Sequence, residues 1–72
     1  MEAEELEKIL SEALKNCLVT VEAQGNHFHI KAVGDVFRGL SAVKRQQLIY
    51  SHINPFIQSG AVHAVTMDLS CD

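Results

Sequence analysis

Histidine side chains are the groups in this sequence best suited to metal chemistry. The histidines and cysteines are His27, His29, His52, His63, Cys17 and Cys71. Neutral imidazole binds iron, zinc, copper and nickel, whereas thiolates prefer soft metals. The two cysteines are far apart in the sequence and form no C-x-x-C pair, so no zinc-type ligand spacing is present. By composition alone, His63 in a strand is more typical of a structural residue than of a ligand.

Basic residues form a second group with possible chemistry. Residues 31–45 carry Lys31, Arg38, Lys44 and Arg45 against a single acid, Asp35, although the net charge of the chain is −3. The plain interpretation is a solvated surface. The sharper one is a basic patch that meets an acidic partner or a phosphate backbone. The overall acidity argues against nucleic acid, because that affinity depends on many Lys and Arg contacts to phosphates.

Composition excludes several classes of protein. The sequence has no nucleophile elbow, no phosphate-binding glycine loop and no zinc motif, so we expect no enzyme. Its 72 residues are 47% hydrophobic, which predicts one folded domain over residues 1–72. No apolar run approaches the ~18 residues of a membrane span, and the acidic N-terminus is unlike a targeting peptide. Two cysteines without a disulfide framework suggest reduced thiols and a cytoplasmic location.

The first half of the chain predicts a helix and a hairpin that positions two histidines. Apolar residues at helical spacing predict a helix over 3–15. Alternating patterns predict strands over 17–24 and 27–33, joined by a turn at Gly25. His27 and His29 then share one face of the second strand, opposite Phe28.

The second half predicts two helices and a strand. Ser41 is a good N-cap for a helix over 42–50. Pro55 fits only near a helix start, so we expect a break between residues 51 and 55 and a second helix over 53–59. A final strand over 61–69 would place His63 at the rim of the sheet, half sheltered, on one face with the apolar residues at 65, 67 and 69.

These elements predict an α+β domain of order α-β-β-α-α-β. The sheet is three-stranded and mixed, with the helices on one face. The helical crossover allows the last strand to run parallel to the second one.

Four segments in this order resemble the BolA family, and in particular its short bacterial branch. They are Gly-Asn-His-Phe at 25–28, Phe-x-Gly-x-Ser at 37–41, Lys-Arg-Gln-Gln-x-x-Tyr at 44–50 and Val-His-Ala-Val at 62–65. The resemblance implies a fold similar to the type II KH fold. The family usually adds a helix after the last strand; this sequence stops at Asp72, so we expect that helix to be either missing or trimmed.

The resemblance also implies a role for His63 as ligand to a [2Fe-2S] cluster. The cluster would be shared with a monothiol glutaredoxin, which contributes its own cysteine and a glutathione thiol. The usual second ligand, from a longer loop between the first two strands, has no counterpart here. His27 is the nearest substitute, ahead of His29, Cys17 and His52. The protein is then expected to be a monomer alone and a heterodimer with its partner.

The family has a second implied function, as a regulator of transcription in stress response and cell morphology. In that case the DNA-binding residues would be Arg38, Lys44, Arg45 and Gln46. Lys44 and Arg45 would contact phosphates, and Gln46 or Gln47 would meet a base edge. The same residues could instead form a solvated face or part of a glutaredoxin-docking surface. A third alternative is a protein-interaction domain that binds no cluster.

Overall fold

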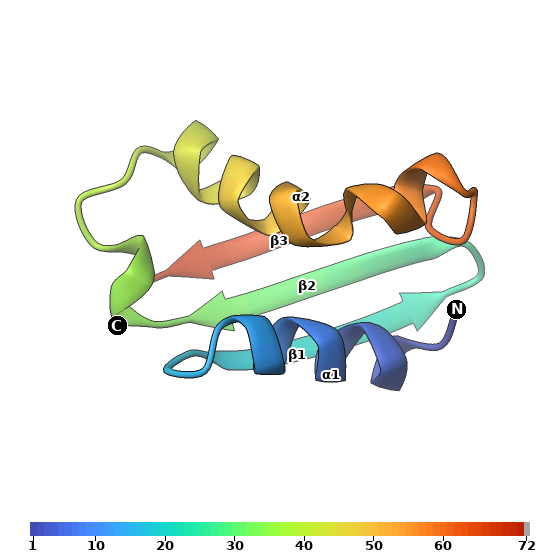
Figure 1. Ribbon diagram of the computed structural model, residues 1–72, viewed down its shortest axis with the longest axis horizontal. Helices are drawn as coiled ribbons and strands as arrows, with labels where there is room; N and C mark the ends of the chain where they lie inside the picture. The colour runs from blue at the N-terminus through green and yellow to red at the C-terminus, as the bar shows by residue number, and fades with distance from the viewer. Residues whose placement is uncertain (72) are drawn as a thin grey trace.

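The computed structural model describes residues 1–71, which form two α-helices and a three-stranded sheet (Figure 1). The elements in order are α1 (Ala3–Ala13), β1 (Leu18–Gln24), β2 (His27–Val33), a 3-10 turn (Asp35–Phe37), α2 (Ala42–Gln58) and β3 (Ala64–Ser70). β2 is the central strand, antiparallel to β1 and parallel to β3. The predicted α+β class and the parallel last strand are therefore confirmed. The expectation that the helix after the last strand is missing concerns the chain end at Asp72, which lies outside the described residues.

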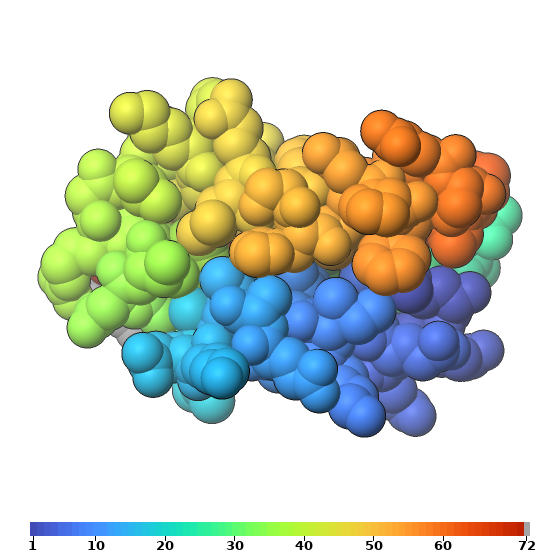
Figure 2. All heavy atoms as spheres, viewed as in Figure 1, coloured from blue at the N-terminus to red at the C-terminus, as the bar shows by residue number. Residues whose placement is uncertain are grey.

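The sheet has one covered face and one open face. α1 and α2 lie on the same side of it (Figure 1), and their side chains meet in front of the strands in the space-filling view (Figure 2). Phe28, Ile30 and Ala32 of β2 point into this layer and are almost fully buried, while His27 and Lys31 are exposed. The open face consists of residues 18, 20, 22 and 24 of β1, 27, 29, 31 and 33 of β2, and 64, 66, 68 and 70 of β3.

Apolar periodicity accounts for α1, and turn chemistry accounts for the hairpin. Leu6, Leu10 and Leu14 recur at helical spacing and are all buried in the core. α1 ends at Ala13, two residues before the predicted end. Gly25, the first residue of the two-residue turn, has a φ of 62°, whereas no non-glycine residue in the described chain, Asn26 included, has a positive φ. This is the pattern of a type II′ hairpin turn.

The helices also satisfy backbone groups at the two outer edges of the sheet. A carboxylate oxygen of Glu7 in α1 accepts a 2.9 Å hydrogen bond from the N–H of Val21 in β1. The guanidinium of Arg45 in α2 donates a 3.0 Å bond to the carbonyl of Leu69 in β3. Each outer strand therefore has a helix side chain on its unpaired edge, which limits pairing with another chain there.

α2 is one helix, so the predicted break between residues 51 and 55 is wrong. Its N-cap is confirmed, since the Ser41 hydroxyl accepts from the N–H of Lys44 at 3.2 Å. Pro55 lies inside the helix, where a proline costs about 3 kcal/mol relative to alanine. Ile49 and Ile53 lie one helical turn apart and are both fully buried. The packing of this continuous apolar face favours an unbroken helix. Pro55 has no N–H, so it leaves the carbonyl of Ser51 without its helical donor. Ser51 and Pro55 are both exposed, so water can donate to that carbonyl.

β3 begins at Ala64, three residues later than predicted. The preceding residues close the turn from α2, where the N–H of Val62 donates to the carbonyl of Phe56 at 3.1 Å and Val62 is 1% exposed. His63 therefore lies just before the strand and is exposed, which corrects the prediction of a half-sheltered strand residue. Val65 and Met67 are half-buried, as expected for the covered face.

Among residues 1–71, neither helix has the length and apolar composition that crossing a bilayer requires.

Candidate functional site

The structure brings His27 and His63 to the same end of the sheet. The Cα of His27 is paired with that of Ala64, the residue after His63, and the N–H of Ala64 donates to the carbonyl of Asn26 at 3.3 Å. Both histidines are exposed. The parallel arrangement of β2 and β3 produces this proximity, because the starts of two parallel strands meet at one edge. We call the region around residues 25–27 and 62–64 the histidine end of the domain.

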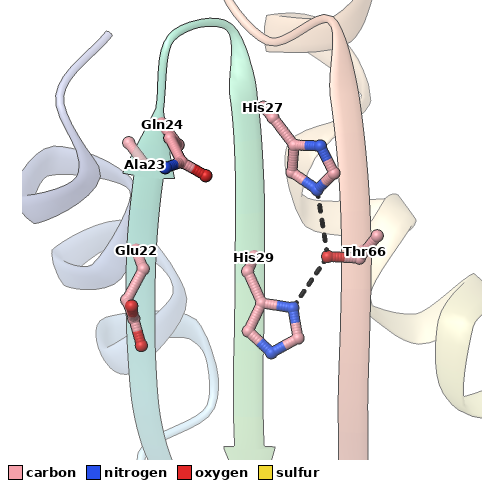
Figure 3. Close-up of a pocket in the computed structure, with 6 residues that line it drawn as sticks. All are labelled: Glu22, Ala23, Gln24, His27, His29 and Thr66. Carbon is pink, nitrogen blue, oxygen red and sulfur yellow. Dashed lines mark hydrogen bonds between the residues drawn. The ribbon is translucent and has the colours of Figure 1, made fainter.

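His27 and His29 both contact one hydroxyl on the open face. His27 Nε2 lies 3.2 Å from Thr66 Oγ1, and His29 Nδ1 lies 2.7 Å from the same atom (Figure 3). These three side chains, with Glu22, Ala23 and Gln24 of β1, line a shallow hollow. Sequence analysis missed Thr66, because its place beside the histidines depends on the pairing of β2 with β3, 37 to 39 residues apart in the sequence.

His27 and His63 supply an incomplete donor set for a metal centre. No group of three or more His, Cys, Asp or Glu side chains in the described part of the chain is placed to hold a metal ion. Two exposed imidazoles at one end of the sheet fit a centre whose remaining ligands come from another molecule. In a [2Fe-2S] centre, two histidines on one iron are a known ligand set.

The cysteines lie at the other end of the domain. Cys17 precedes Leu18, which pairs with Val33 at the far end of β2 from His27. Six residue steps along β2 correspond to roughly 20 Å. Burial raises the pKa of the half-buried Cys17 thiol, and the nearby Asp35 carboxylate raises it further. A raised pKa disfavours the thiolate that binds metals, so Cys17 is poorly placed as a ligand partner for His63.

The four predicted partner-binding residues have different environments. Arg38 forms an exposed 2.9 Å salt bridge with Asp35, which raises the pKa of its guanidinium and offsets its charge. Arg45 is half-buried and donates from Nε to the carbonyl of Leu40 at 3.1 Å, in addition to its bond to Leu69. Arg45 therefore fastens α2 to β3. Lys44 and Gln46 are exposed on α2.

The basic residues and the histidine end are at opposite ends of the molecule. α2 begins beside the end of β3, where Arg45 contacts Leu69, and runs back towards residues 62–64. Figure 1 shows the start of α2 and the β1–β2 turn at opposite sides of the view. A single small partner surface centred on His63 therefore does not include Lys44.

A family model and a curated relative both match this chain, and they point to the same family. The profile described as "BolA-like protein" matches residues 5–71. The acid stress protein IbaG of Escherichia coli K12 is 39% identical over 67 residues, which cover 93% of this chain and 80% of IbaG.

Solved structures share the fold. The BolA domain of SufE1 from Arabidopsis thaliana superposes with a TM-score of 0.83 and 27% identity, covering 96% of this chain and 90% of that one. A BolA homologue from Coxiella burnetii has a TM-score of 0.84 at 22% identity, covering 99% and 91%. With residues 5–71 matched and this identity to IbaG, the chain belongs to the BolA family.

Proposed function

We propose that this protein is an adaptor that binds a monothiol glutaredoxin and shares a labile [2Fe-2S] cluster with it. It would act in iron–sulfur assembly, iron sensing or stress regulation, within a reducing compartment such as the cytoplasm. BolA family proteins are non-enzymatic, so a binding function is the appropriate class. The observation that carries the proposal is the meeting of two exposed histidines, His27 and His63, at one end of the sheet.

The chemistry of these residues supports a shared cluster. Two imidazoles leave half of a four-ligand site unfilled, and a glutaredoxin cysteine with a glutathione thiol would complete it. Neutral imidazole in place of thiolate also raises the reduction potential of such a cluster. Because both histidines are exposed, a partner can approach them without any rearrangement of the core.

A second candidate function is DNA binding through the first turns of α2. Lys44 and Gln46 are exposed there, and they are free for a partner when the histidine end is occupied. Against this function, Arg38 is paired with Asp35, Arg45 is held by two carbonyls, and the net charge is −3. The remaining basic surface is therefore small for the phosphate contacts that DNA affinity requires.

The test of the adaptor function is the visible absorption and circular dichroism of the anaerobic complex. The protein is co-purified with a monothiol glutaredoxin and glutathione, as wild type and as His63→Ala, His27→Ala and His52→Ala. We expect a cluster spectrum that differs from that of the glutaredoxin homodimer in the wild type and His52→Ala. His63→Ala should return the homodimer spectrum, and His27→Ala should weaken or shift the heterodimer signal.

His52 is the matched control, because it is a half-buried histidine in α2 rather than at the histidine end. A spectrum that does not change when this protein is added would contradict the adaptor function. A complex that forms but stays without a cluster would instead support a protein-interaction domain.

A further inference from the structure

The hydroxyl of Thr66 connects two imidazoles on the open face. Thr66 comes from β3, and His27 and His29 come from β2, two positions apart on the same face (Figure 3). Thr66 Oγ1 lies 2.7 Å from His29 Nδ1 and 3.2 Å from His27 Nε2. A hydroxyl carries one hydrogen, so it can donate to only one of these rings. The other ring must donate to the hydroxyl if both contacts are hydrogen bonds.

The two contacts differ in length, and the order of their lengths matches one direction of the chain. Hydroxyl donors make short hydrogen bonds, with a mode near 2.7–2.8 Å, whereas N–H donors extend to about 3.2 Å. These distances fit the direction in which Thr66 donates to His29 Nδ1 and His27 Nε2–H donates to Thr66. A chain of two bonds in one direction also lets each bond polarise the other.

The intrinsic chemistry of imidazole gives the same assignment. In this direction both rings carry their hydrogen on Nε2, the form that neutral histidine prefers in water. In the reverse direction both rings would carry it on Nδ1, the less stable form. The preference of the free side chain and the two distances therefore agree.

We propose that Thr66 and His29 are positioning residues that hold His27 in its Nε2–H form, which makes Nδ1 the metal-binding atom of His27. This inference rests on the proposed function, since it specifies how His27 would serve the shared cluster. In Figure 3 the Nδ1 atom lies on the side of the His27 ring away from Thr66, towards the start of β3, which His63 precedes. The hydrogen bond to Thr66 thus directs the free lone pair of His27 towards the histidine end.

Partners in the outer shell commonly fix the orientation and tautomer of a ligating histidine. Here the fixing group is a hydroxyl in β3, and His29 in turn keeps the hydrogen of that hydroxyl away from His27. A serine at position 66 retains the hydroxyl, whereas valine keeps the shape of threonine and removes it. The pair Thr66→Ser and Thr66→Val therefore separates the hydrogen bond from the packing.

The first experiment observes the tautomer in the isolated protein, without any cluster. Long-range proton–nitrogen NMR correlation on the ¹⁵N-labelled chain distinguishes a protonated ring nitrogen from one with a free lone pair. The spectra of all variants are recorded at the same pH of about 8.5, roughly two units above the reference value for free histidine. We expect a free lone pair on His27 Nδ1 and a hydrogen on Nε2 in the wild type and Thr66→Ser.

Thr66→Val and His29→Phe should move the two His27 nitrogen signals towards each other, because the ring then exchanges between tautomers. Thr20→Val is the matched control, since Thr20 is an exposed threonine on the same open face, in β1 opposite Lys31. It should leave the His27 signals unchanged. A hydrogen on Nδ1 of His27 in the wild type, or His27 signals that Thr66→Val does not alter, would overturn the inference.

The second experiment measures cluster retention in the heterodimer with glutaredoxin. We expect Thr66→Val to lose the cluster about 10-fold faster than the wild type, in line with other outer-shell ligand partners. Thr66→Ser and Thr20→Val should stay near the wild-type rate. A wild-type heterodimer that holds no cluster would overturn the proposed function, whereas the NMR result decides the tautomer separately. Equal loss rates in Thr66→Val and Thr20→Val would contradict the positioning role.

Discussion

At the scale of single residues, Gly34 is required by the close approach of the chain that precedes β1. Its φ of 176° is ordinary extended backbone, so the reason is space and not conformation. A Cβ there would lie 2.5 Å from Cys17 Sγ, 3.1 Å from Cys17 Cα and 3.2 Å from the carbonyl oxygen of Asn16. The sulfur can move aside, but the two backbone atoms lie in the turn between α1 and β1.

We expect Gly34→Ala to lower the free energy of unfolding by about 1–3 kcal/mol, the usual cost of overpacking. The measurement is urea unfolding of Gly34→Ala, Cys17→Ala and the double variant. The double variant should recover part of the loss, since the shortest contact is to the thiol. Strictly additive effects of the two changes would show that the sulfur is not the main obstacle.

At the scale of elements, α2 continues through Pro55 because packing outweighs local preference. The sequence correctly predicts the Ser41 cap, and the structure confirms it with the bond to the N–H of Lys44. The break was wrongly predicted because the cost of proline is visible in the sequence, whereas the burial of Ile49 and Ile53 is a property of the assembled core. The same holds for β3, whose late start follows from the turn that buries Val62.

We expect Pro55→Ala to raise the free energy of unfolding by about 2 kcal/mol. The gain is the helix-interior cost of proline, less the entropy that proline removes from the unfolded chain. Asn54→Ala is the control, since Asn54 is exposed in the same turn of α2. The helix propensities of asparagine and alanine differ by under about 1 kcal/mol. Equal changes in the two variants, measured by urea unfolding, would mean that the helix already accommodates Pro55 without strain.

At the scale of the whole molecule, the histidine end and the basic start of α2 are separated by the length of the sheet. The residues proposed for the two functions implied by the family therefore lie on different surfaces of this protein. A glutaredoxin bound at His63 would leave Lys44 exposed, so one activity does not exclude the other.

We expect Lys44→Glu to leave the cluster spectrum of the heterodimer unchanged, because Lys44 is remote from His63. Retention on double-stranded DNA is then compared for the wild type, Lys44→Glu and Lys8→Glu at about 50 and 200 mM salt. Lys8 is an exposed lysine of α1, so Lys8→Glu makes the same change of charge at a different place on the surface. Weaker retention in Lys44→Glu alone would support the DNA function, and equal retention in both variants would count against it. A cluster spectrum altered by Lys44→Glu would contradict the separation of the two surfaces.

The sequence by itself determined the α+β class, the hairpin and the capped start of α2. These depend on local signals, namely residue periodicity, the conformational freedom of Gly25 and the hydroxyl of Ser41, which act over a few residues. It also supplied the family resemblance, and with it His63 as a residue of interest. Tertiary structure decided the rest. The register of β2 against β3 placed His27 near His63 and Thr66 between two histidines. The docking of α2 turned Arg45 from a surface cation into a link to Leu69. These contacts join residues 24 or more positions apart, and no local pattern encodes which of them will meet.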